Sequence, residues 1–527
     1  MEGKKRISGL KLALKTSVVS GMTLLSRILG LIRDIVFARF FGAGLLMDAF
    51  LVAQRIPNML RRFFAEGAFS AGFVPVMARY KERHDHEEVR EYVDAVAGTF
   101  GVVLFMVTLL GVIGAPALVL VVAPGFVGDG GDFDLAALML RFTFPYLFFV
   151  SLTAFAGGVL NTYGRFGVPA FTPVILNVVL IAAAVWAAPL LEQPIMALAY
   201  AVFIAGVVQL LFQLPFLAAI RALPRPKWRP RHDGVRRAFR LMVPAIFGSS
   251  VAQINVLVSG IIASLLPVGS ISYLYYSDRL MEFPLGLFGI ALATVTLPYL
   301  SRLWANEDRQ EFAETLEWSM KIAVLIAVPA AIGLVVLASP LVITLFMGGV
   351  FDARSAAMTA LALQAYAVGL VGFSFVKVLA PAFFAREDTR TPVRIGILAL
   401  VVNVVLGSSA AWYMTATGMT GPHTALAAAT SVAALLNAAL LYRGLRKAGV
   451  VQHSAGWGAL LLRVVLANTA MGLVLVALHR EIAWWSGAGP GERGWWLGVS
   501  VVAGAATYFA ALIFLGLRPQ QLRLRHD

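Results

Sequence analysis

Apolar residues in this chain come in long runs, separated by short segments that are rich in Arg, Lys, Gly and Pro. A helix needs about 20 apolar residues to cross a bilayer. Runs of roughly this length predict fourteen membrane-spanning helices, over residues 14–41, 45–78, 94–123, 135–162, 170–188, 195–221, 236–266, 272–302, 314–338, 355–384, 392–414, 421–446, 457–479 and 494–517. Several runs exceed what a bilayer requires, so we expect tilted helices or bends at Pro57, Pro145, Pro244 and Pro284.

The basic residues between these runs are unevenly distributed. If the N-terminus lies in the cytoplasm, the cytoplasmic connections contain most of them, at residues 79–90, 165, 221–240, 302–309, 386–394 and 443–447. The opposite connections contain only Arg354, Arg480 and Arg493. An excess of Arg and Lys in short cytoplasmic loops sets the orientation of membrane proteins. We therefore predict that both termini are cytoplasmic.

Short motifs recur at a separation of 223 to 226 residues. Gln54-Arg55-Ile56 matches Asp278-Arg279-Leu280, and Asn177-Val-Val-Leu matches Asn403-Val-Val-Leu. Such a repeat indicates two parallel six-span halves, followed by two further helices. The predicted fold is an all-α polytopic membrane protein with an N-terminal lobe over 1–221, a basic cytoplasmic linker over 222–240, a C-terminal lobe over 241–447, and a C-terminal helix pair with its tail over 448–527.

The linker between the halves is strongly basic. Its Pro residues favour an extended chain, and its charges favour water or anionic lipid headgroups. A simple topological anchor is preferred over a specific recognition segment, because loop charges of this kind commonly fix orientation.

Composition agrees with a membrane protein and narrows its chemistry. Of 527 residues, 59% are hydrophobic and 13% are charged, against about 25% charged in soluble domains. The absence of Cys excludes disulfides, Cys-ligated metals and thiol catalysis. The net charge of +15 lies in loops between apolar spans, which argues against a nucleic-acid partner. No enzyme motif stands in a usable context, and we expect neither a cofactor nor a metal ion.

Two acidic clusters have simpler explanations than metal binding. The residues around His84 and Asp85 fit the solvated start of a helix, and Asp129, Asp132 and Asp134 fit an external polar turn.

The stretch from Ser26 to Glu66 is apolar yet dense in charge. A charge at the bilayer centre costs about 3 kcal/mol, so this density suggests a water-filled cavity. In the second span, four charged residues fall on one helical stripe, at Asp48, Arg55, Arg62 and Glu66, and in the first span Arg27 and Asp34 are seven residues apart with Arg33 beside them. These charges could merely neutralise each other. However, Arg is in excess, and guanidinium groups suit phosphate, so a multivalent anion is the preferred ligand.

The eighth span contributes Asp278, Arg279 and Glu282. Arg279 occupies in the second half the place that Arg55 has in the first, which predicts that both halves direct an Arg to a shared interface. An ion pair of Arg279 with Glu282, three residues on, is the structural alternative.

Two long motifs carry a family resemblance. These are SRILGLIRDIVFARFFGAGLLMDAFLVAQRIPNMLRRFFAEGAFSAGFVPV and YYSDRLMEFPLGLFGIALATVTLPYLSR. They closely resemble the MurJ (MviN) family of bacterial lipid II flippases, in the multidrug/oligosaccharidyl-lipid/polysaccharide exporter superfamily. The resemblance covers essentially the whole chain. It implies MATE-like lobes in the bacterial inner membrane, translocation of undecaprenyl-diphosphate-linked peptidoglycan precursor to the periplasmic leaflet, and a groove for the lipid tail beside the last two helices.

The resemblance also implies roles for individual residues. The family's essential Arg positions fall on Arg27, Arg33, Arg61 and Arg279, with Arg62 as a neighbour, and these are the expected diphosphate-binding residues. Gating or coupling is expected of Asp34, Asp48, Arg55, Glu66, Asp278 and Glu282. The expected partners are lipid II, membrane lipids and a coupling ion, H⁺ or Na⁺. The seventh span offers only the uncharged Gln253 and Asn255, which argues against a sodium site that some relatives have there.

Three other functions are alternatives to a flippase. A multidrug exporter of the same architecture would favour cationic drugs and an acidic cavity, which the excess of Arg opposes. A membrane-bound glycosyltransferase would need catalytic acids or a metal on a water-facing loop. A non-transporting scaffold would leave the charges inside the membrane unexplained.

Overall fold

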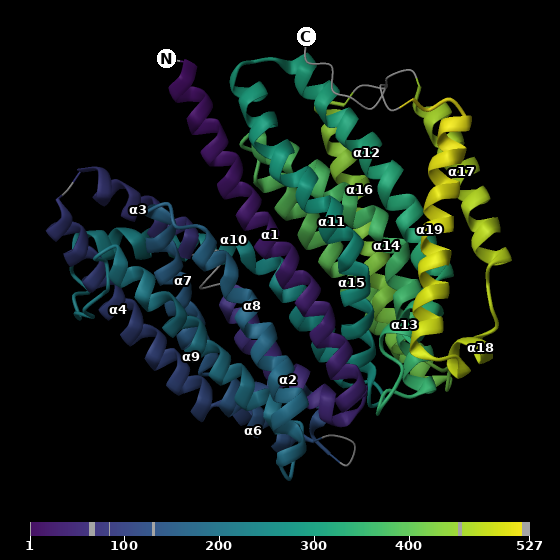
Figure 1. Cartoon of the computed structure of the whole chain (residues 1–527), viewed down its shortest axis with the longest axis horizontal. Coiled ribbons are helices and arrows are strands. Elements are labelled where there is room, and N and C mark those ends of the chain that lie inside the picture. Colours follow the sequence, from purple (N-terminus) through teal and green to yellow (C-terminus); the bar gives the residue numbers. More distant parts are fainter. Residues whose placement is uncertain (1, 63–68, 84, 129–131, 452–455, 519–527) are drawn as a thin grey trace. The chain divides into compact units, whose positions relative to one another are not determined.

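The computed structural model describes residues 2–62, 69–83, 85–128, 132–451 and 456–518. Within these residues the secondary structure is helical, and the only β-type pairing is an isolated bridge between Gly348 and Phe351. The chain forms two compact units, Met1–Val268 and Gly269–Asp527, which we describe separately. Figure 1 shows their helices.

The first unit contains ten α-helices in the part of the chain that the structure describes. They are α1 (Glu2–Phe41), α2 (Leu45–Arg61), α3 (Phe69–Arg83), α4 (His86–Ile113), α5 (Ala115–Val122), α6 (Phe133–Thr143), α7 (Tyr146–Thr162), α8 (Gly167–Ala182), α9 (Met196–Ala219) and α10 (Asp233–Ser264). The long helix α1 lies beside α8, and α7 packs between α9 and α3 (Figure 1). Although the sequence repeat assigns α10 to the second half, α10 packs against α3 and α4 in this unit.

The second unit contains nine α-helices among its described residues. They are α11 (Ser270–Ala305), α12 (Arg309–Val336), α13 (Ala338–Leu345), α14 (Ala353–Ala385), α15 (Arg390–Ala416), α16 (His423–Lys447), α17 (Trp457–Ala477), α18 (Ile482–Gly487) and α19 (Pro490–Phe514). The helix α14 contacts α11, α12 and α16, so it forms the centre of this unit.

The predicted apolar runs are helical over most of their described residues, with informative differences. The run 94–123 is divided at Gly114 into α4 and α5, and the run 135–162 is divided at Pro145 into α6 and α7. By contrast, α2 and α11 continue past Pro57 and Pro284. The short helices α13 and α18 were not predicted, because each is far below the length of a span. Ten helical segments in the described residues are long and apolar enough to cross a membrane.

The core of the first unit lies between α3, α4 and α7. Phe73, Tyr92, Phe100 and Phe155 are its largest buried side chains, and the rings of Phe73 and Tyr92 stack with centroids 5.8 Å apart. Gly72 allows α10 to approach, since a Cβ on Gly72 would lie 2.3 Å from Cγ of Met242. Close helix contact through a small residue is typical of membrane proteins, where lipid gives helices no hydrophobic reason to associate.

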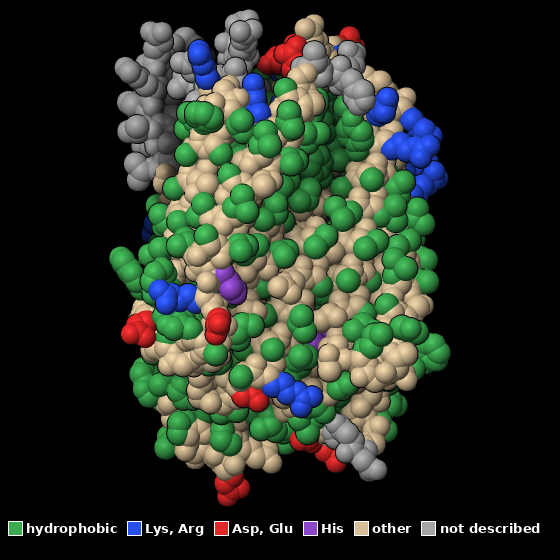
Figure 2. All heavy atoms as spheres, turned by 90° about the vertical axis from the view of Figure 1, so that its right-hand side faces the viewer, with side chains coloured by type: hydrophobic (Ala, Val, Ile, Leu, Met, Phe, Trp, Pro, Cys, Tyr) green, Lys and Arg blue, Asp and Glu red, His purple; other side chains and the backbone are tan. Residues whose placement is uncertain are grey.

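The C-terminal helices pack on α12 and present an apolar outer face. Tyr508 of α19 donates a hydrogen bond of 2.8 Å to the carbonyl of Leu325, which satisfies its buried hydroxyl. On the outside, Leu462, Val465 and Phe514 are exposed. Figure 2 shows this side of the molecule covered by hydrophobic side chains, with few charges, as a lipid-facing surface requires.

The connection from α9 to α10, residues 220–232, runs along the surface of α4. We call this segment the basic strap. The backbone N–H of Arg225 donates to Oδ1 of Asp94 at 2.7 Å, and the backbone N–H of Lys227 donates to the Asp94 carbonyl at 3.0 Å. Nζ of Lys227 lies 3.2 Å from Oδ2 of Asp94, which is 3% exposed. The predicted linker 222–240 is extended only in its first part, because α10 begins at Asp233.

We expect Asp94→Ala to release the basic strap. The substitution removes the acceptor of the Arg225 N–H and the partner of Lys227, and a lost buried hydrogen bond to a charged group costs about 1.5–3 kcal/mol. In purified protein, trypsin should then cleave after Lys227 or Arg231 at least about tenfold faster. Glu91→Ala, which removes only the exposed partner of Arg229, serves as the control. Equal cleavage of both variants would show that Asp94 does not hold the strap.

Candidate functional site

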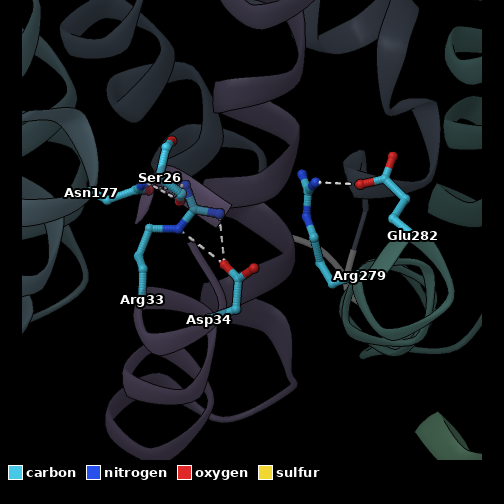
Figure 3. A network of polar contacts seen from close by, with 6 residues as sticks. All are labelled: Ser26, Arg33, Asp34, Asn177, Arg279 and Glu282. Atoms are coloured by element: carbon cyan, nitrogen blue, oxygen red, sulfur yellow. Dashed lines mark hydrogen bonds and ion pairs between the residues drawn. The ribbon is translucent and has the colours of Figure 1, made fainter. Parts of the chain in front are cut away.

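Arg33 is the centre of a polar network inside the first unit (Figure 3). Its Nε and Nη2 atoms donate to Oδ1 of Asp34 at 3.0 and 2.7 Å, and its Nη1 donates to Oδ1 of Asn177 at 3.0 Å. The side chains of Arg33 and Asp34 are 13% and 2% exposed. A guanidinium held by two partners in this way is fixed in direction before any ligand arrives.

Asn177 connects this network to α8. Its Nδ2 donates to the carbonyl of Ser26 at 3.0 Å, so the amide bonds two points of α1 that are two turns apart. A Cβ on Gly30, which lies between those points, would be 3.9 Å from Nδ2, an ordinary contact. The repeat analysis marked Asn177 and Asn403 as corresponding residues but assigned them no role. Both are buried, and Asn403 accepts from Thr430 at 3.2 Å in the second unit.

Arg55 and Asp48 lie on α2, and their side chains differ in how far they are buried. Asp48 is 3% exposed, while Arg55 is partly buried with Nη1 fully enclosed. The Arg55 guanidinium lies against the backbone of α10 at Gly260, where a Cβ would be only 1.5 Å from Nη1. Sequence reasoning missed Gly260, because nothing in a glycine on a long apolar helix signals which distant side chain passes over it.

The remaining predicted residues of the first unit are less enclosed. Nε of Arg61 donates to Oδ1 of Asn58 at 3.0 Å at the end of α2. Arg27 and Arg62 are partly exposed. Glu66 lies outside the described residues, so the predicted stripe on the second span can be followed only as far as Arg62. Arg39, which the sequence analysis left without a role, has an Nε that is buried and meets no hydrogen-bond partner in the described part of the chain.

In the second unit, Arg279 pairs with Glu282 on α11 (Figure 3). Its Nη1 lies 2.9 Å from Oε2 of Glu282, and the two side chains are 32% and 47% exposed. The Arg279 guanidinium also lies over the ring of Tyr275, 5.0 Å from the centroid. The ion pair that the sequence offered as an alternative is therefore present. Asp278 is partly buried one residue before Arg279.

Lys377 is a further cation; the sequence places it near the end of the tenth span with Glu387 and Asp388, where a helix-end ion pair is favoured over a role in cation coupling. It lies on α14 well before that helix ends at Ala385, and it lines a small cavity between α11, α12 and α14 together with Pro284, Ser374 and apolar residues. Of the acidic residues after this helix, Asp388 has another partner, since its Oδ1 accepts from the Thr391 N–H at 3.0 Å. Hydrogen bonds from the Thr391 side chain and from its backbone N–H hold the pKa of the Asp388 carboxyl below its usual value.

Described members of the two acidic clusters cap helices, while His84 and Asp129 lie outside the described residues. Asp85 caps α4 by accepting from the Glu88 N–H, and Asp132 caps α6 by accepting from the Leu135 N–H. Among the residues searched, which are those that the structure describes, no group of three or more His, Cys, Asp or Glu side chains could hold a metal ion.

The chemistry that this arrangement permits is anion binding. Arg33 and Arg279 each hold one carboxylate. A phosphate offers more charge and more acceptor oxygens than a carboxylate, so it can replace the acid as partner of the guanidinium. The acid would then be released to another partner or to a proton.

Comparison with known proteins identifies close relatives. The family model "Lipid II flippase MurJ" matches residues 37–488. A protein of Vibrio cholerae named probable lipid II flippase MurJ is 46% identical, covering 96% of each chain. A protein of Burkholderia cenocepacia named lipid II flippase MurJ is 43% identical, covering 96% of this chain and 98% of its own.

Comparison with solved structures leads to the same family. A structure of lipid II flippase MurJ in an inward closed conformation matches with a TM-score of 0.77 and 25% identity, covering 94% of this chain and 97% of its own. An inward-facing multidrug resistance transporter of the MATE family, in the MOP superfamily, matches with a TM-score of 0.66 and 15% identity, covering 82% of this chain and 98% of its own. The second likeness concerns the fold alone.

Proposed function

Because this chain belongs to the MurJ family of lipid II flippases, within the MOP superfamily, we propose that its buried arginines bind the diphosphate of lipid II during transport. Its function is translocation of lipid II, the lipid-linked precursor of the peptidoglycan cell wall. It is a transporter rather than an enzyme, and it is a multi-pass protein of the bacterial inner membrane.

The Arg33 network is the observation that carries the proposed binding site. Asp34 and Asn177 hold the Arg33 guanidinium in one orientation. Binding of a phosphate therefore costs little further side-chain entropy. The diphosphate takes the place of Asp34 on Arg33. Arg27, Arg61 and Arg62 complete the positive side of the site in the N-terminal half.

Arg279 contributes from the second half by the same exchange of partners. Its pair with Glu282 is partly exposed, so an incoming phosphate competes with a weakly held carboxylate. Asp278 and Glu282 then take the gating role in that half, as Asp34, Asp48 and Glu66 take it in the first. Arg55 supports this exchange from α2.

We infer that transport follows alternating access between two lobes. The sequence repeat supports lobes over 1–221 and 241–447, joined by the linker 222–240, with the lipid-tail helices over 448–527. Fourteen crossings then place both termini in the cytoplasm, in agreement with the basic loops. Lipid II moves from the cytoplasmic to the periplasmic leaflet. The driving force is the membrane potential, worth about 2.3 kcal/mol per charge and 100 mV, or coupling to H⁺ or Na⁺.

Rescue of a depleted cell tests the function directly. The chain, expressed in a bacterium whose own lipid II flippase can be shut off, should restore growth and peptidoglycan synthesis. Vesicles that contain the purified protein should also move labelled lipid II across the bilayer. Rescue without translocation in vesicles would point to a supporting role in the cell wall, and failure of both would refute the proposed function.

A further inference from the structure

The basic strap has a fixed backbone, which an ordinary topological anchor does not require. Beyond the two bonds to Asp94, the N–H of Arg229 donates to Oγ1 of Thr99 at 3.3 Å, and Arg229 pairs with Glu91. Gly98 lets the strap backbone lie directly on α4, since a Cβ there would be 2.3 Å from the carbonyl carbon of Lys227. Loop charges orient a protein whatever their conformation. This precise attachment therefore calls for a further explanation.

The strap lies where α4 changes from polar to apolar. Residues 86–94 of α4 include several acidic and basic side chains, whereas residues 95–113 include none. The hydrogen bonds from the strap backbone to α4 run from Asp94 to Thr99, which is this point of change. The strap also follows directly on α9, a candidate membrane span that ends at Ala219. Both observations put the strap at the level of the lipid headgroups.

The outward side of the strap combines basic side chains with an exposed indole. Arg225, Lys227, Arg229 and Arg231 are exposed, and Trp228 in their midst is 57% exposed. Asp94 and Glu91 partly offset Lys227 and Arg229, whereas Arg225 and Arg231 have no ion pair among the described residues. Trp is enriched where proteins meet the membrane interface, because its ring is apolar and its N–H is polar.

We propose that the basic strap is a docking site for anionic phospholipid headgroups of the bilayer. Arg225 and Arg231 bind headgroup phosphates, and Trp228 enters the headgroup layer between them. The occupant is a patch of bilayer rather than a single lipid-linked diphosphate, because exposed basic side chains recur along the strap from Arg225 to Arg231 with the exposed Trp228 among them. Charge complementarity supports this choice, since residues 221–240 contain eight Arg or Lys and one Asp. The proposal does not depend on the proposed transport function.

The absence of Cys permits a specific test. Trp228→Cys introduces the only thiol in the chain, which can be labelled with an environment-sensitive fluorophore. The labelled full-length protein is placed in nanodiscs of neutral phosphatidylcholine, or in nanodiscs in which phosphatidylglycerol replaces a third of that lipid. We expect a blue shift and a rise in emission with the anionic lipid, both weakened by high salt. Each basic side chain near an anionic surface strengthens binding about fivefold.

Charge variants distinguish binding of anionic lipid by the strap from attraction of that lipid by the net positive charge of the protein. Arg225→Gln with Arg231→Gln should remove most of the response and keeps the backbone N–H that Asp94 binds. Arg443→Gln with Arg446→Gln removes the same charge from the exposed end of α16 and should leave the response intact. Trp186 is also exposed. The emission of a fluorophore attached to a Trp186→Cys variant should not change with anionic lipid. Native mass spectrometry of retained lipid, with Trp228 in place, repeats the comparison should the labelled variant fold poorly.

Three outcomes would overturn the proposal. The first is equal emission in neutral and anionic nanodiscs. The second is an unchanged response, and unchanged lipid retention, in the Arg225→Gln and Arg231→Gln variant. The third is a response to added lipid II in neutral nanodiscs but none to phosphatidylglycerol, which would make the strap a capture site for the transported substrate instead.

Discussion

Arg33→Ala should abolish rescue of a flippase-depleted bacterium and reduce lipid II translocation in vesicles by about tenfold or more. A hydrogen bond between charged partners contributes about 1.5–3 kcal/mol, and 1.4 kcal/mol corresponds to a factor of ten. Arg33→Lys keeps the charge but loses the planar fork that contacts both Asp34 and Asn177. We therefore expect it to fall between the alanine variant and the unsubstituted protein.

Arg165→Ala is the matched control for this experiment. Arg165 is an exposed arginine in the turn after α7, so its loss should leave transport unchanged. Asn177→Leu should reproduce part of the Arg33→Ala defect, because it removes one of the two groups that orient the guanidinium while leaving its charge. Transport by Arg33→Ala at the unsubstituted rate, with equal amounts of protein in the membrane, would refute the role of Arg33 in diphosphate binding.

The sequence was sufficient to mark Arg33 and Asp34 as candidate residues, because charges in apolar spans are costly and therefore informative. It could not show how they are held. The bond from Arg33 to Asn177 joins residues 144 positions apart, and an Asn on an apolar helix has many possible partners. The repeat drew attention to Asn177 without giving its function. In the second unit, the local Arg279–Glu282 pair could be predicted, since it depends only on helical spacing.

Helix positions followed from hydropathy, while helix ends and groupings did not. Pro145 ends a helix but Pro57 does not, and only the neighbouring helices decide whether a freed carbonyl finds another partner. The repeat groups α10 with the second half, yet its contacts with α3 and α4 lie in the first unit. Likewise, the charges of the linker were evident from sequence, but its attachment to Asp94 depends on a carboxylate in a distant helix.

The contact between Arg55 and Gly260 leads to a second prediction with a large effect. A Cβ on Gly260 would lie 1.5 Å from Nη1 of Arg55, and the atom in its way is the end of a flexible side chain rather than backbone. Gly260→Ala should therefore leave α10 helical and expel the Arg55 guanidinium. Alanine is also the better helix former, by about 1 kcal/mol.

Gly260→Ala and Arg55→Ala should consequently cause the same transport defect, about tenfold, because each removes one charged hydrogen-bond donor from the exchange of partners that Arg55 supports. The double variant should be no worse than either single one, because both changes remove one contact and their effects cannot add. Gly101→Ala on α4, where nothing lies within 4 Å of the new Cβ, is the control and should transport normally. Additive losses in the double variant would mean that Gly260 acts on transport by a route other than the position of Arg55.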